Sequence, residues 1–341
     1  MNTQKINPME NIESNIDKEI LKWSMGNERY LNIVAPPYSS VKTLITTLYS
    51  YLLKSNRILY VTNEKINEIQ IEEELKHLGF KNYTYVSKED SNYKDSLLVL
   101  CSFEGMQNIK GEFKVVILDD SRAFPEYKGE DIVDLISKNY FHEAKYISFS
   151  LESIFEGFRE IIIPVRENKL PMVEPRFLTT RIDLSKEMPY VAYEYIKWSL
   201  KAGRNVIIYV PTKDSVKQVF KYLSTFKETN SKHIIYHVEG SLDERVIQNY
   251  SISKEVILIT NDFKKVYSGV RENDIMVFFA DNSQYNYKSL VHFCGKVGRG
   301  ENIKRAEVIF LSNSISEDME TAKDITRSFN KEAWEMNLFQ F

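Results

Sequence analysis

The chain has 341 residues, 43% apolar and 27% charged, which is the composition of a folded protein with about two domains. Its formal net charge is -3, so bulk charge does not indicate nucleic-acid binding, and any such surface must be a local patch. Two cysteines exclude a disulfide framework and a four-cysteine zinc site, and no apolar run is long enough to span a bilayer or resembles a signal peptide, so we expect a cytoplasmic protein.

The first half alternates strand-like apolar runs with helical patterns, which is typical of parallel sheets joined by crossover helices. We expect strands at residues 31–35, 58–62, 97–101, 115–118 and 146–150. Between the first two, Leu44, Leu48 and Leu52 recur at helical spacing and predict a helix packed on the sheet. A second helical pattern follows the 58–62 run, and Gly79 predicts where that helix stops.

Residues 35–43 lie between the first expected strand and the first expected helix, at the position and length of a phosphate-binding loop. Pro36 and Val41 stand where that loop has glycines, whereas Lys42 and Thr43 are retained. The glycines let successive N–H groups point at the phosphates, so their loss predicts weak ATP binding. Ser40, Lys42 and Thr43 would contact the nucleotide, with Thr43 also on Mg²⁺. A Lys-Thr pair that opens a helix is common, however, and does not by itself define a nucleotide site.

Two acidic residues, Asp119 and Asp120, follow the expected strand 115–118. Helicase-type ATPases have an Asp-Glu pair here, in which the Asp holds Mg²⁺ through water and the Glu activates the attacking water. Asp119 can take the first role, and Asp120, one methylene shorter than glutamate, would take the second. The alternative is that both residues cap the turn after a strand. Ser148 and Ser150 end the next strand, where such ATPases have a Ser-Ala-Thr motif, although serines there also cap helices.

Residues 164–190 break the alternation, because they contain four prolines and no helical period. We place a hinge here, between an N-terminal lobe of residues 1–163 and a C-terminal lobe of residues 191–341. In the second lobe we expect strands at residues 206–210, 234–238, 256–260, 275–279 and 307–311. A closing helix against this lobe is predicted by helically spaced Met319, Ala322, Ile325, Phe329, Ala333 and Met336.

Two places in the second lobe lie where helicases contact nucleic acid. The first is Thr212 with its neighbour Lys213, which follow the 206–210 strand. The second is Asp243 with Arg245, which follow the 234–238 strand. We expect Thr212, Lys213 and Arg245 to contact a nucleic-acid backbone.

The stretch from residue 292 to residue 300 contains a basic residue between two glycines, Gly298 and Gly300. Arg299 therefore has room to approach a ligand closely, and we expect it to stabilise transition-state charge from the second lobe. Lys296 stands where a further arginine would contact the nucleotide, and it keeps the charge but loses the bidentate fork. The alternative for Arg299 is a solvated side chain in a glycine-rich turn.

The order of these motifs resembles that of superfamily 2 helicases, and within them the late-competence ATPase family ComFA. The acidic motif continues into the Ala-Phe-Pro of that family at residues 123–125. The hinge is similar at Leu170, Pro171 and Pro175, and the closing motif matches at Gly295, Val297, Gly298 and Arg299. The resemblance covers roughly residues 28–315 and implies two tandem RecA-like α/β lobes with parallel sheets. It also implies an ATP- and Mg²⁺-dependent motor that pulls single-stranded DNA into the cytoplasm together with competence proteins at the membrane.

The chain departs from that family mainly at the nucleotide chemistry. It lacks the four-cysteine zinc module, so no zinc is expected, and it has Asp120, His292 and Lys296 in place of Glu, Gln and Arg. Three functions therefore stay open: a DNA-dependent ATPase and translocase, a non-hydrolysing scaffold that binds nucleic acid or a protein partner, and an unrelated two-lobed α/β enzyme. Nucleotide turnover with and without single-stranded DNA distinguishes them.

Overall fold

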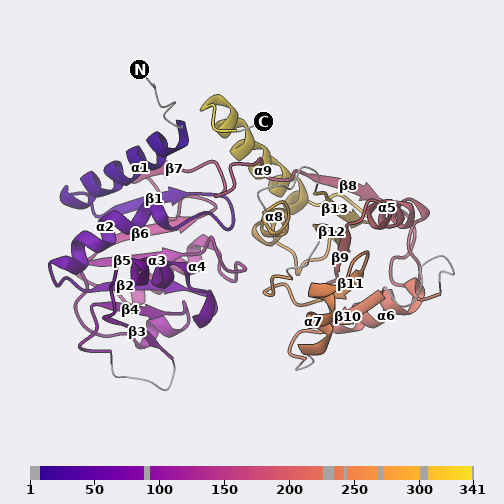
Figure 1. Cartoon of the computed structure of the whole chain (residues 1–341), viewed down its shortest axis with the longest axis horizontal. Helices are drawn as coiled ribbons and strands as arrows, with labels where there is room; N and C mark the ends of the chain where they lie inside the picture. Colours follow the sequence, from indigo (N-terminus) through magenta and orange to yellow (C-terminus); the bar gives the residue numbers. More distant parts are fainter. Residues whose placement is uncertain are drawn as a thin grey trace. The chain divides into compact units, whose positions relative to one another are not determined.

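The computed structural model describes residues 8–87, 93–225, 234–241, 244–267, 272–299 and 306–339. The chain forms two compact units (Figure 1). The first consists of residues 1–169 and 331–341, and the second of residues 170–330. The division at residue 170 falls within the segment expected to form a hinge.

The first unit is a seven-stranded sheet in which every pairing is parallel. Its strands are ordered β3-β4-β2-β5-β6-β1-β7 across the sheet. Its elements are α1 (Pro8–Met25), β1 (Tyr30–Val34), α2 (Lys42–Leu53), β2 (Ile58–Thr62), η1 (Ile66–Glu68), α3 (Gln70–His77), β3 (Tyr83–Val86), β4 (Leu98–Cys101), η2 (Gly105–Asn108), β5 (Val115–Asp119), α4 (Gly129–Lys138), β6 (Lys145–Ser150) and β7 (Arg159–Ile162).

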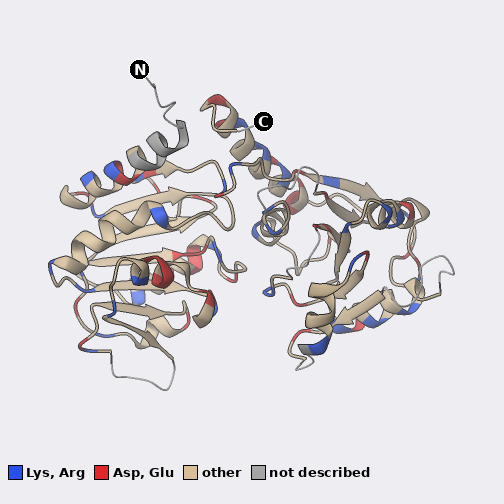
Figure 2. Ribbon diagram, viewed as in Figure 1, with Lys and Arg blue, Asp and Glu red and all other residues tan. Residues whose placement is uncertain are grey.

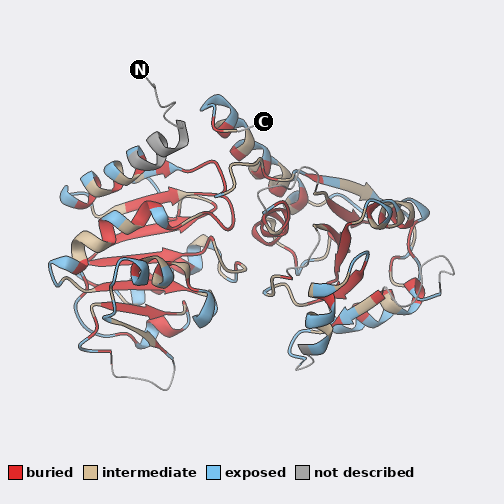
Figure 3. Ribbon diagram, viewed as in Figure 1, coloured by how far each residue is buried: buried red, intermediate tan, exposed pale blue. Residues whose placement is uncertain are grey.

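Helices cover both faces of this sheet, which explains why its central strands read as unbroken apolar runs. Side chains of α1, α2 and α3, among them Trp23 and Leu48, pack with Ile33 and Ile117 on one face. On the other face, α4 and η2 pack against alternate strand residues such as Leu118. The central strands are accordingly buried throughout (red in Figure 3).

The second unit is a six-stranded sheet, also parallel at every pairing, in the order β10-β11-β9-β12-β13-β8. Its elements are β8 (Pro175–Thr179), α5 (Tyr190–Lys201), β9 (Asn205–Tyr209), α6 (Lys213–Leu223), β10 (Ile234–His237), α7 (Glu244–Ile252), β11 (Ile257–Thr260), β12 (Asn273–Phe278), α8 (Tyr287–Lys296), β13 (Val308–Ser312) and α9 (Glu317–Glu335). Helices α5 and α6 pack on one face. An aromatic cluster of Tyr209, Phe263, Tyr285 and Phe293 joins β9 to α8.

The prediction of parallel α/β architecture is confirmed, and all ten expected strands are present with ends shifted by at most two residues. Three strands were not expected. β3 and β7 are edge strands of the first sheet, and β8 lies inside the proline-rich segment, where Pro175 begins an edge strand that pairs with β13. Proline is tolerated at a strand start or a sheet edge, which is where it lies here.

The closing helix α9 was predicted to lie against the second lobe, and its residues are divided between the two units. Residues from 331 onward belong to the first unit, where Ala333 and Leu338 form a small buried cluster with Val165. The earlier part of the helix belongs to the second unit and buries Met319 and Ala322. In the described part of the chain, no helix combines the length and apolar character that a bilayer crossing requires.

Candidate nucleotide and nucleic-acid sites

The loop between β1 and α2 lies at the carboxyl end of the first sheet, where ligands bind in parallel α/β folds. The Ala35 N–H donates to Ser150 O (2.9 Å), which fixes the start of the loop to the end of β6. The Tyr38 N–H donates to Ser121 O (3.0 Å), just beyond β5. The predicted phosphate loop and the predicted acidic motif are therefore adjacent in the first unit.

The backbone donors of this loop are largely taken by acceptors of the protein itself. Pro36 and Pro37 have no N–H to offer. Four further N–H groups have protein acceptors: Tyr38 to Ser121 O, Ser39 to Pro36 O, Val41 to Gln70 Oε1 (3.1 Å) and Lys42 to Ser40 Oγ (3.3 Å). In a phosphate-binding loop these are the groups that would surround the anion. In this conformation these four N–H groups point at protein acceptors and not at an anion.

The left-handed residue of the loop is Tyr38, with φ 62°, rather than either of the positions where glycine was expected. Val41 has φ -81° and is fully buried, so it carries no backbone strain. A non-glycine residue in the left-handed region costs about 1 kcal/mol, which burial of the Tyr38 side chain helps to offset. The left-handed turn of this loop therefore lies at Tyr38.

A buried ion pair between Arg122 and Glu64 supports the loop. Arg122 Nη1 donates to Ser39 O (2.8 Å), and Arg122 Nε lies 3.2 Å from Glu64 Oε2. The Gln70 N–H also donates to Glu64 Oε2 (3.4 Å), while its side-chain oxygen accepts from Val41. Sequence reasoning missed Glu64, Gln70 and Arg122. Arg122 does lie inside the motif that carried the family resemblance, and this was the available signal.

Burial makes these acidic groups hard to ionise. The pKa of Glu64 is raised to about 7, first by burial and then by the negative charge of Asp119, and Arg122 opposes the rise. Burial also raises the pKa of Asp119, although its hydrogen bond from Tyr60 opposes this. The pKa of Tyr60 is well above its usual value, because the ring is buried beside two carboxylates.

Asp119, the predicted Mg²⁺ ligand, is fully buried and accepts three hydrogen bonds. Tyr60 donates to Oδ2 (2.5 Å), and the N–H and hydroxyl of Ser121 donate to Oδ1 (3.0 and 2.9 Å). Asp120 is also buried, and its N–H donates to Phe149 O (2.9 Å). Among the residues that the structure describes, no group of three or more His, Cys, Asp or Glu side chains could hold a metal ion.

Lys42 and Thr43 differ in their surroundings. The Lys42 ammonium is half-exposed and lies 3.3 Å from Glu167 Oε1 and 3.7 Å from Glu74 Oε1. The Thr43 hydroxyl is buried, and no hydrogen-bond partner for it exists among the described residues. Ser40 Oγ accepts from the Lys42 N–H. Thr43 is thus the group at this loop that keeps an unused polar atom for a ligand.

The two serines at the end of β6 have structural partners. Ser148 Oγ donates to Asn32 Oδ1 (2.9 Å), and the same oxygen accepts from the N–H groups of Ile154 and Phe155. Ser150 Oγ donates to Glu152 O (2.6 Å). These bonds join β1, β6 and the turn that follows β6.

In the second unit, Thr212 caps α6 by accepting from the Ser215 N–H (3.1 Å). Lys213 is exposed at the first position of that helix, and Arg245 is exposed in the first turn of α7. Asp243 lies outside the described residues, as does Gly300. The nucleic-acid roles of Thr212, Lys213 and Arg245 stay predictions.

The closing motif lies at the end of α8. The Lys296 ammonium donates to Phe263 O and to Lys265 O (3.1 Å), and it lies over the Tyr209 ring, 4.9 Å from the centroid. Lys296 is therefore bound within its own unit. Arg299 is exposed and follows Gly298, which has φ 65°. A contact between Arg299 and a nucleotide stays a prediction.

Two tandem all-parallel units, with a modified phosphate loop in the first and a glycine-bracketed arginine in the second, define the two-lobed RecA-like fold of helicases. Solved structures agree on the fold. Xpd4 of S. tokodaii has a TM-score of 0.57 at 10% identity, covering 97% of this chain and 98% of that one. Dbp5 of S. cerevisiae bound to RNA and ADP BeF3 has a TM-score of 0.54 at 11% identity, covering 95% of this chain and 90% of that one. The DUF1998 helicase MrfA bound to DNA and AMPPNP has a TM-score of 0.56 at 13% identity, covering 97% of this chain and 53% of that one.

In sequence the chain is similar to competence protein ComFA of Bacillus subtilis (strain 168). The two are 23% identical over 255 residues, which is 71% of this chain and 54% of the relative. The chain thus spans about half the length of the curated relative that it matches. No family model matches the sequence.

Proposed function

We propose that this protein is a ComFA-like single-stranded DNA-binding protein that keeps the helicase fold but does not run an ATP-driven translocation cycle. The observation that carries the proposal is the state of the phosphate loop, where two prolines and four engaged N–H groups replace the anion cradle. The three hydrogen bonds that Asp119 accepts from protein donors support it. The similarity to a competence protein favours incoming DNA as the ligand and competence proteins at the membrane as partners, with the protein on the cytoplasmic side.

A working motor is the second candidate. The buried hydroxyl of Thr43, which has no partner among the described residues, favours it, because this is the group that would face Mg²⁺ in an intact loop. Lys42, Asp119 and Arg299 also have the residue types that the helicase motifs have at these positions. A nucleotide would then have to displace Gln70 and Ser40 from the loop donors before it could bind.

Nucleotide binding and turnover by the purified protein separate the two. We expect weak binding of a fluorescent ATP analogue and no phosphate release above background, with or without an oligo-dT strand. Turnover that oligo-dT stimulates and that Lys42→Ala abolishes would establish the motor instead. Binding of labelled oligo-dT is measured in parallel, and its absence even at low salt would leave a protein-binding role as the better account.

A further inference from the structure

Helix α6 carries three lysines on its solvent side. Lys213, Lys217 and Lys221 are all exposed and recur every four residues, so they form one stripe with about 6 Å of rise between neighbours. Figure 2 shows basic residues along this helix. No ion pair or hydrogen bond holds any of the three among the residues that the structure describes. By contrast, lysines on other helices pair with glutamates, as Lys76 does with Glu72.

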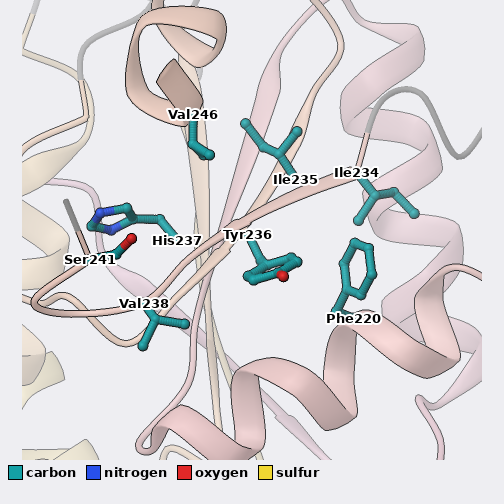
Figure 4. Close-up of a pocket in the computed structure, with 8 residues that line it drawn as sticks. All are labelled: Phe220, Ile234, Ile235, Tyr236, His237, Val238, Ser241 and Val246. Atoms are coloured by element: carbon teal, nitrogen blue, oxygen red, sulfur yellow. The ribbon is translucent and has the colours of Figure 1, made fainter. Parts of the chain in front are cut away.

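An aromatic pocket lies beside this stripe, at the edge strand β10. It has a volume of about 370 Å³, at the lower end of the range for ligand pockets. Figure 4 shows Phe220 of α6 next to Tyr236 of β10, and their ring centroids are 4.8 Å apart. Tyr236 keeps 46% of its residue surface exposed. The Tyr236 ring is thus packed against Phe220 and still offers an exposed surface to a ligand.

Helical geometry places the stripe and the pocket together. Phe220 lies three residues after Lys217, so the two are neighbours on the helix surface. The opposite side of α6 buries Val216, Val219 and Leu223 against the sheet. The stripe therefore runs along the solvent side of α6, next to Phe220, which contacts Tyr236 at the β10 edge.

We infer that this surface, the lysines of α6 with Phe220 and Tyr236, binds a single-stranded polynucleotide, its phosphates on the lysines and a base on Tyr236. Regularly spaced cations beside an aromatic platform are how proteins hold single strands without reading sequence. The inference rests on the proposed function and gives it a location. An acidic protein segment would use the lysines but would gain little from an exposed, supported ring.

The test measures anisotropy of labelled oligo-dT and oligo-U with full-length protein between about 50 and 200 mM salt. Lys213→Gln/Lys217→Gln/Lys221→Gln should weaken binding about tenfold or more at the lower salt and flatten the salt slope by about 2. The matched control, Lys54→Gln/Lys81→Gln/Lys110→Gln, removes the same charge from exposed positions of the first unit and should bind like wild type.

The aromatic part is tested separately. Tyr236→Leu should weaken binding about fivefold or more without changing the salt slope, and Tyr236→Trp should restore it. Photocrosslinking of oligo-dT should label the peptide that contains Tyr236.

The outcomes separate two failures. If wild type binds neither oligomer, the proposed function is wrong. If wild type binds and the α6 triple variant binds equally well, only this location is wrong. Equal losses in the two triple variants, or competition by polyglutamate as strong as that by oligo-dT, would also overturn the nucleic-acid assignment for this surface.

Discussion

Glu64→Gln should change how stability depends on pH, because the buried Glu64 carboxyl resists ionisation. Its pKa is about 7 in the folded protein, against about 4.5 when unfolded. The folded state therefore binds more protons than the unfolded state between these values, so wild-type stability falls as pH rises through this window. Between pH 5 and pH 8 the loss attributable to Glu64 is about 2 to 3 kcal/mol, and the glutamine variant does not suffer it.

The measurement is urea unfolding at pH 5 and pH 8, followed by Trp23 fluorescence. The chain has three tryptophans, so Trp198→Phe and Trp334→Phe leave a probe buried in the first unit. The free energy of unfolding of Glu64→Gln minus that of wild type should move by about 2 to 3 kcal/mol in favour of the variant from pH 5 to pH 8. The exposed Glu112→Gln serves as the control. A movement below about 1 kcal/mol, or one of opposite sign, would refute the account of Glu64.

Three further predictions concern the first unit. Pro36→Gly/Val41→Gly should strengthen binding of a fluorescent ATP analogue about tenfold, the equivalent of one recovered charge-assisted hydrogen bond, and wild-type binding already at low micromolar levels would contradict this. Lys145→Met should cost about 2 kcal/mol of unfolding free energy, because its ammonium donates to three carbonyl oxygens at the end of α1, and an unchanged urea midpoint would count against that role. Asn32→Leu should cost about 4 kcal/mol, since it strands four buried hydrogen-bond partners, and a loss below 1 kcal/mol would show that β1 and β6 do not depend on it.

The central strands could be predicted because they are buried on both faces, and burial imposes long apolar runs. β3 could not, since its tyrosines and threonine are only half-buried at a sheet edge, which weakens the pattern. β8 was hidden by Pro175, which at an edge takes part in the sheet without needing its missing N–H. The alternation of strands and helices was enough to predict the α/β class.

At the loop, spacing located Lys42 and Thr43 but could not show where the backbone donors point. Their direction depends on Glu64 and Gln70, which follow β2, and on Arg122, which follows β5, and the two segments meet only after the sheet has formed. Nor could the spacing show that the left-handed residue of the loop is Tyr38 and not Val41. The residue types predicted the loss of a phosphate-binding loop, whereas tertiary hydrogen bonds determine which acceptors the N–H groups of the loop have.

The path of α9 affects the order in which the two units finish folding during synthesis. The cluster of Val165, Ala333 and Leu338 draws on two parts of the chain separated by the whole second unit. At synthesis rates of roughly 5–20 residues per second, the ribosome needs roughly ten to thirty seconds to make that intervening unit. During this interval the first unit has its sheet and main cores but lacks its last apolar contact. Chaperone binding to nascent chains should therefore persist at Val165 after the rest of the first unit has become protected.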